Sequence, residues 1–102
     1  MEGWIDMFIA ILTYKKPLEE VDCFLQAHRD YLAVHYAAGN FIASGPQNSR
    51  IGGVIMMKAD SRVDVDAIIS QDPFNLNGIA DYQIVEFNPT MFCDAVLSNF
   101  LL

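Results

Sequence analysis

Basic residues are scarce in this sequence. Six lysines and arginines stand against thirteen aspartates and glutamates, which leaves a formal net charge of −7. A protein of this charge repels phosphate backbones and anionic lipid headgroups. Long apolar runs are missing too, because charged residues interrupt the 53% of the chain that is hydrophobic before a membrane span is reached. The composition predicts a globular domain and excludes nucleic acid and membranes as expected partners.

Cysteine is also rare, with only Cys23 and Cys93. The two residues form no CxxC pair, so neither a redox motif nor a zinc knuckle can be drawn. Two isolated thiols predict a reducing, cytoplasmic location, and a single disulfide is the alternative. Residues 1–6 are acidic where a signal peptide would be basic, and we expect them to form an N-terminal extension that precedes the fold.

Motifs that bind metals or cofactors are absent from the sequence. His35 follows His28 by seven residues on one helix face, but the helix rises by roughly 10.5 Å over that distance, too far for a shared metal. We therefore predict that His35 is a helix-end residue. Gly52-Gly53 leads into a strand, so we expect a hairpin that needs unusual backbone angles and not a phosphate cradle. Neither a metal nor a cofactor is expected.

A chain of 102 residues has room for one domain. Hydrophobic periodicity predicts strands at 7–14, 41–44, 53–58 and 81–87, with helices from about 18 to 39 and from 61 to 70. The resulting order, β-α-β-β-α-β, is the split form of the ferredoxin-like α+β sandwich. Asn88-Pro89 is typical of an N-cap followed by proline, which predicts a short C-terminal helix over 90–102 with Phe92, Val96 and Phe100 on one face.

The strand at 7–14 is apolar on both faces. Two helices on a four-stranded sheet cover only one of its faces, so something else has to cover the other. We expect the C-terminal helix to cover part of this face and a second copy of the chain to cover the rest. The sequence thus predicts a homodimer.

Three motifs in a fixed order carry a family likeness. These are the helix segment at 27–32 (AHRDYL), the stretch at 38–46 (AGNFIASGP) and the segment at 71–74 (QDPF), which runs on to Asn77-Gly78. Together they resemble the YciI-like (YCII-related) family over residues 7–89. The likeness rests on the three motifs together and on no single one of them.

The resemblance implies a ferredoxin-like subunit of the dimeric α/β-barrel type. It also implies an active site built from the helix histidine and the aspartate of the DPF turn, here His28 and Asp72. One branch of the family resembles dehydrochlorinases that act on chlorinated hydroxyhydroquinones. Many members carry an arginine where this chain has Leu25, and Arg29 and Arg50 are the candidates to replace it. The loop after Gly45-Pro46 is shorter than in many members, so we expect a different pocket mouth.

His28 lies between Leu25 and Leu32 on the apolar stripe of its helix. From the pattern alone, a core histidine bonded to backbone is the better explanation, whereas the resemblance favours a general base held in one tautomer by a carboxylate. Asp72 precedes proline and is a natural N-cap. One carboxylate oxygen would suffice for the cap, which leaves the other free to accept from the imidazole of His28.

Other side chains are candidates for the walls of a pocket. Ser44 lacks the glycine pattern of a nucleophile elbow and does not precede a helix, so we assign it a wall position and not a nucleophilic role. Aromatic residues at such places are more often part of the core, but a flat apolar ligand would also pack against them. The predicted substrate-binding residues are Tyr14, Arg29, Ser44, Gly45, Pro46 and Phe74.

Two functions remain open on the sequence. In the first, His28 removes a proton from a small cyclic or phenolic substrate while Asp72 orients the ring, and elimination or isomerisation follows without a cofactor. In the second, the protein is a non-catalytic dimeric binding or accessory protein in which the pair only stabilises the fold. An enzyme needs a ligand-sized cavity at His28, whereas a structural pair should be sealed by protein.

Overall fold

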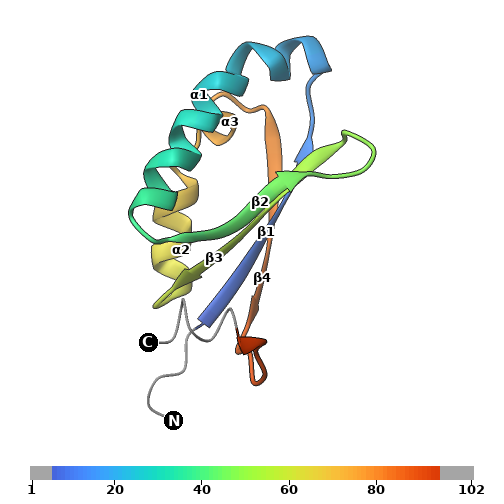
Figure 1. The fold of residues 1–102 in the computed structure, drawn as a ribbon. Coiled ribbons are helices and arrows are strands. Elements are labelled where there is room, and N and C mark those ends of the chain that lie inside the picture. Colours follow the sequence, from blue (N-terminus) through green and yellow to red (C-terminus); the bar gives the residue numbers. More distant parts are fainter. Residues whose placement is uncertain (1–5, 95–102) are drawn as a thin grey trace.

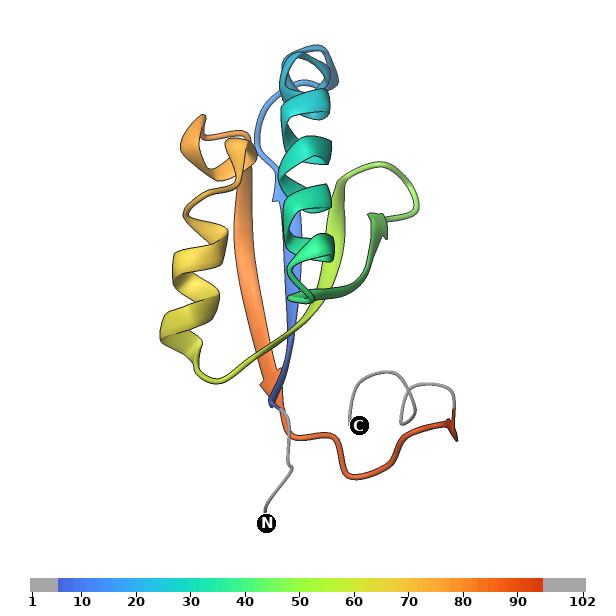
Figure 2. The same cartoon turned by 60° about the vertical axis from the view of Figure 1, so that its left-hand side comes forward.

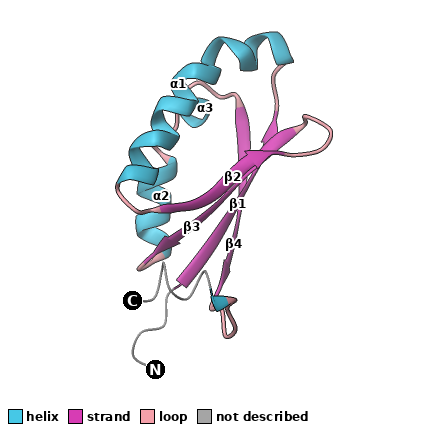
Figure 3. Ribbon diagram, viewed as in Figure 1, coloured by secondary structure: helices cyan, strands magenta, loops and turns pink. Residues whose placement is uncertain are grey.

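The computed structural model describes residues 6–94 (Figure 1). Within this range the chain forms four strands and three helices (Figure 3). The strands are β1 (Asp6–Tyr14), β2 (Phe41–Pro46), β3 (Gly52–Ala59) and β4 (Ala80–Phe87), and the helices are α1 (Leu18–Ala37), α2 (Arg62–Ile69) and α3 (Pro73–Leu76).

The strands pair in an antiparallel sheet with the order β2-β3-β1-β4. Strand β1 is central and pairs with both β3 and β4, which come much later in the sequence. The helices lie together on one face of the sheet (Figures 1 and 2). The ferredoxin-like α+β fold predicted from the order of elements is therefore confirmed, and it is the subunit fold of dimeric α/β barrels.

The core lies between the sheet and the helices. Alternate residues of β1 point into it, where Phe8 and Leu12 are almost fully buried. The helices contribute Val21 from α1 and Val65 from α2 to the same cluster. Gly39 follows the end of α1 with a φ of +81°, the left-handed conformation that glycine adopts readily after a helix.

Several boundaries differ from the sequence prediction. Strand β2 runs on through Pro46 instead of stopping at Ser44, because β3 pairs with Gly45 and Pro46 as well. The predicted turn at Asp72 contains the four-residue helix α3. Residues 90–93 of the predicted C-terminal helix have no regular secondary structure, and Asp94 is the first helical residue. The rest of the predicted helix, with positions 96 and 100, lies outside the described residues.

Gly52 has a different structural role from the one predicted. Within the described chain only Gly39 and Gly78 have a positive φ, so unusual backbone angles do not explain Gly52-Gly53. A Cβ at Gly52 would lie 1.7 Å from the backbone oxygen of Leu12. The close approach of β1 to β3 therefore requires glycine at this position.

The sheet face opposite the helices is apolar around Ile9. Ile9 of β1 lies between Met56 of β3 and Val85 of β4 in the register of the sheet. Val85 and Phe87 each keep 40% of their surface exposed. No described helix packs over this face (Figure 2).

Two further findings concern the predicted environment of the protein. Cys23 and Cys93 are both exposed free thiols, as the sequence predicted. Among residues 6–94, no helix combines the length and hydropathy that crossing a membrane requires.

Candidate functional site

The inward face of α1 carries the central residue of the site. Val21, His28, Tyr31 and His35 are the buried residues of this helix. The periodicity of the helix turns His28 toward the core, where only 9% of its surface stays exposed. The ring of Phe74 stacks on the imidazole with a centroid distance of 4.0 Å and an interplanar angle of 6°. This stacking fixes the plane of the imidazole.

Asp72 is fully buried at the start of α3. Its Oδ1 accepts the backbone N–H of Phe74 at 3.0 Å, as an N-cap does, with Pro73 in the first helical position. The same oxygen lies 2.8 Å from Nδ1 of His28. One carboxylate oxygen thus serves both as the cap and as the partner of the histidine, whereas the sequence assigned these roles to two oxygens.

The second oxygen of Asp72 accepts a hydrogen bond from the hydroxyl of Tyr82 on β4. Burial, together with the nearby carboxylate of Asp72, holds the pKa of Tyr82 far above its usual range, so the phenol stays a donor. Tyr82 was not among the site residues predicted from the sequence. A signal was present, because the period of a strand places Ala80, Tyr82 and Ile84 on the same, helix-facing side of β4.

The hydrogen bonds define the tautomer of His28. A carboxylate only accepts, so Nδ1 carries the proton that it shares with Asp72. Nε2 of His28 has no hydrogen-bond partner within the described part of the chain. Every buried side-chain nitrogen or oxygen in that part has a partner, so the unpartnered Nε2 is not buried. Nε2 is therefore a free acceptor that is open to small molecules.

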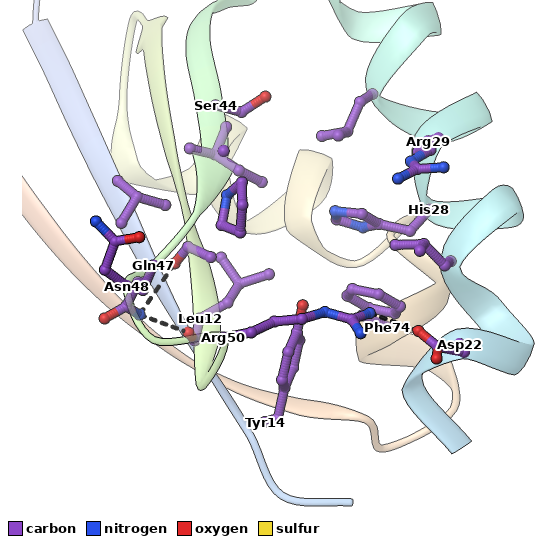
Figure 4. A pocket seen from close by; sticks show the side chains of 17 residues that line it. Leu12, Tyr14, Asp22, His28, Arg29, Ser44, Gln47, Asn48, Arg50 and Phe74 are labelled. Carbon is purple, nitrogen blue, oxygen red and sulfur yellow. Dashed lines mark hydrogen bonds and ion pairs between the residues drawn. The ribbon is translucent and has the colours of Figure 1, made fainter. Parts of the chain in front are cut away.

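A cavity of about 600 Å³ adjoins His28. Figure 4 shows His28 and Phe74 on one side, with the β2–β3 hairpin on the other. All six predicted substrate-binding residues line it, namely Tyr14, Arg29, Ser44, Gly45, Pro46 and Phe74. Asp72 does not line the cavity and lies behind the imidazole. The structure therefore brings the predicted residues together, with His28 between the cavity and the carboxylate.

Three polar residues that line the cavity were not predicted as ligand contacts: Asp22, Gln47 and Asn48. Asp22 precedes Leu25 by three residues and Arg29 by seven, so helical periodicity alone places it on their face of α1. Its carboxylate accepts a hydrogen bond from Arg50, which also lines the cavity. This bond raises the pKa of Arg50 above its ordinary value, and the guanidinium keeps its charge.

The chain can now be placed among known proteins. A sequence model of the YCII-related domain matches residues 7–88. The chain belongs to the YCII-related family. No curated protein matches its sequence.

A solved structure supports the fold of this YCII-related protein. It is 5-chloro-2-hydroxyhydroquinone dehydrochlorinase from Burkholderia phenoliruptrix AC1100 in complex with 2,5-dihydroxybenzoquinone, to which this chain is similar with a TM-score of 0.71. The two sequences are 20% identical, and the match covers 79% of this chain and 92% of that chain. At this identity the likeness shows a shared fold.

The second histidine of this YCII-related protein lies outside the cavity. Nε2 of His35 is 2.9 Å from Oε1 of Gln71, and its Nδ1 is 3.0 Å from Nδ2 of Asn40. Both ring nitrogens thus have protein partners. His35 lies in the last turn of α1, as predicted. No group of side chains suited to a metal ion occurs in residues 6–94.

Proposed function

We propose that this protein is a small-molecule enzyme in which Nε2 of His28 removes a proton from a small cyclic or phenolic substrate. The electron pair of the broken bond then forms a double bond as a leaving group such as chloride departs, which is an elimination. Alternatively the proton returns to another carbon, which is an isomerisation. Both routes move only protons and electron pairs within the substrate and need no redox cofactor.

The observation that carries this proposal is the arrangement of the two imidazole nitrogens. Nδ1 is bound to a buried carboxylate, and Nε2 is unpartnered beside a cavity. A carboxylate in this position holds the ring in one orientation and compensates the positive charge that the ring gains on protonation. These are the requirements of a general base.

The cavity is suited to a flat ring. Its lining combines the aromatic side chains of Tyr14 and Phe74 with the aliphatic side chains of Leu12, Leu25 and Leu32. Its volume of about 600 Å³ lies within the range of roughly 300–1,000 Å³ typical of small-molecule sites. The similar solved structure belongs to an enzyme named for dehydrochlorination of a hydroxyhydroquinone, which supports a dehydrochlorinase-like reaction here.

A homodimer in the cytoplasm is part of this proposal. The apolar sheet face around Ile9, Met56 and Val85 offers a second copy a surface to bury. Obligate interfaces resemble a domain core cut in half, which fits such a face. The exposed free thiols support a reducing environment.

The second candidate function is a non-catalytic dimeric protein that binds a small molecule or assists another protein. One observation favours it: Asp72 also caps α3 and accepts from Tyr82, so its burial would stabilise the fold without any reaction. The two functions differ in whether bound ligand is converted.

The test uses a pair of histidine variants on the same helix. Purified protein is mixed with 5-chloro-2-hydroxyhydroquinone, and chloride release is measured. For His28→Gln we expect a loss in kcat of roughly 10²- to 10⁴-fold, the usual contribution of a general base. The control is His35→Gln, which alters a buried histidine outside the cavity and should keep turnover.

The outcomes separate the two functions. Loss of turnover in the His28 variant alone supports proton abstraction by this residue. Turnover that survives His28→Gln contradicts it. If the wild-type protein binds phenolic and quinol compounds in calorimetry but converts none of them, the enzyme proposal fails and the binding function replaces it.

A further inference from the structure

Positive charge gathers at the cavity of an otherwise acidic protein. The chain carries six basic side chains against thirteen acidic ones, yet Arg29 and Arg50 both line this cavity. Asp22 is the one carboxylate among its described lining residues. Ligands of negative charge are therefore favoured here although the protein as a whole repels them.

Arg50 reaches across the cavity from the β2–β3 loop to α1. Its Nη2 donates to Oδ1 of Asp22 (Figure 4). The side chains of this ion pair are 38% and 54% exposed. Ion pairs with that exposure contribute little to folding, since water and salt screen them. Arg50 can therefore exchange Asp22 for another anion at small cost.

The backbone that carries Arg50 is held in place on both sides. Nε2 of Gln47 donates to the carbonyl oxygen of Leu12 at 3.0 Å, and the backbone N–H of Tyr14 donates to the carbonyl oxygen of Ile51 at 2.8 Å. Both bonds tie the loop to β1. A change of partner at Arg50 then needs only its side chain to move.

Arg29 supplies a second cation without a competitor. Its side chain has no hydrogen-bond or ion-pair partner among the described residues. It follows His28 directly on α1 and lines the same cavity. An acid group bound to either arginine would place the ring of the ligand in the cavity that His28 and Phe74 also line.

We propose that the cavity prefers monocyclic phenolic acids to neutral phenols with the same ring, and that the carboxylate of the acid takes the place of Asp22 on the guanidinium of Arg50. This inference rests on the cavity of the proposed function and names the class of its ligand. Asp22 then acts as an internal competitor that holds Arg50 extended in the free protein. Arg50 is the specificity-determining residue.

A pair of matched probes isolates the charge of the ligand. The probes are 2,5-dihydroxybenzoate and 2,5-dihydroxybenzamide, which share the ring and its hydroxyls but differ in charge at neutral pH. Isothermal titration calorimetry measures both with the wild-type protein and the variants. We expect the acid to bind more tightly than the amide, and its advantage to shrink as sodium chloride is raised.

The variants act in opposite directions on the acid. Arg50→Gln should weaken the acid roughly 10-fold and change the amide less than about twofold, because only the acid loses a charge-assisted bond. Asp22→Asn should tighten the acid about 2- to 10-fold, since it removes the competitor. The matched controls are Arg62→Gln and Asp66→Asn, which break an exposed ion pair on α2 and should alter neither probe.

The inference is overturned if Arg50→Gln weakens acid and amide alike, if Asp22→Asn weakens the acid, or if the wild-type protein binds neither probe. His28→Gln separates this result from the proposed function. That variant should lose turnover yet keep the preference for the acid, because the two arginines remain. If His28→Gln loses turnover and the wild-type protein shows no preference for the acid, proton abstraction is supported and the anion site is rejected.

Discussion

Asp72 is the residue on which the hydrogen bonds of the site converge, and Tyr82 supplies one of them. Tyr82→Phe would leave one oxygen of a fully buried carboxylate without its donor. We expect a loss of about 1–3 kcal/mol in the free energy of unfolding, measured by urea denaturation. Nitrogen-15 NMR of the imidazole should also show a changed proton position in His28.

The control for this prediction is Tyr36→Phe. The hydroxyl of Tyr36 pairs with Oγ of Ser44 at the surface, 2.7 Å away. Its loss should cost less than about 0.5 kcal/mol, as surface substitutions usually do, and should leave the imidazole signals unchanged. If Tyr82→Phe behaves like this control, Tyr82 does not position Asp72 and His28.

The raised pKa of Tyr82 also predicts how stability depends on pH. Above about pH 10, tyrosine in the unfolded chain loses its proton, while the buried Tyr82 keeps it. The unfolded state then binds fewer protons than the folded state, so the free energy of unfolding falls as pH rises. Denaturation between pH 9 and 11 should show a shallower fall for Tyr82→Phe than for the wild type, and equal slopes would contradict this cause.

At the scale of elements, the register of β1 with β3 depends on one glycine. Gly52→Ala would place a Cβ against backbone atoms of Leu12 and Thr13, which cannot give way as a side chain does. We expect a loss of more than about 2 kcal/mol in thermal or urea unfolding, a cost typical of overpacking. The matched control is Gly45→Ala on β2, where an added Cβ meets nothing within 4 Å. Equal stabilities of the two variants would refute this explanation.

The elements that the sequence predicted are those with a clear period. The alternation in β1 and the long apolar stripe of α1 specify their type, because each period reflects burial against the core. The helix α3 was missed because four residues are too short to show a period, although Asp72-Pro73 did signal a capped turn. The partnership of Tyr82 with Asp72 was missed because it depends on the pairing of β4 with β1 and not on local sequence.

At the scale of the whole molecule, the sheet has two unlike faces. One face is covered by α1, α2 and α3 (Figure 2). The other presents half-buried and exposed apolar side chains around Ile9 and Val85. The sequence could indicate this asymmetry, since β1 is apolar on both sides. The sequence also predicted a cover, the C-terminal helix and a second copy of the chain, but the residues of such an interface depend on surfaces that meet only after folding.

A second copy of the chain is the cover that we predict. Light scattering coupled to size exclusion, at micromolar concentration, should give the mass of a dimer. Val85→Glu puts a charge on the open face, where its desolvation would oppose association, so we expect the mass to fall toward that of a monomer. Val63→Glu is the matched control, because Val63 lies on α2 and is 75% exposed. A wild-type monomer, or a dimer that tolerates Val85→Glu as well as Val63→Glu, would show that this face does not carry the dimer interface.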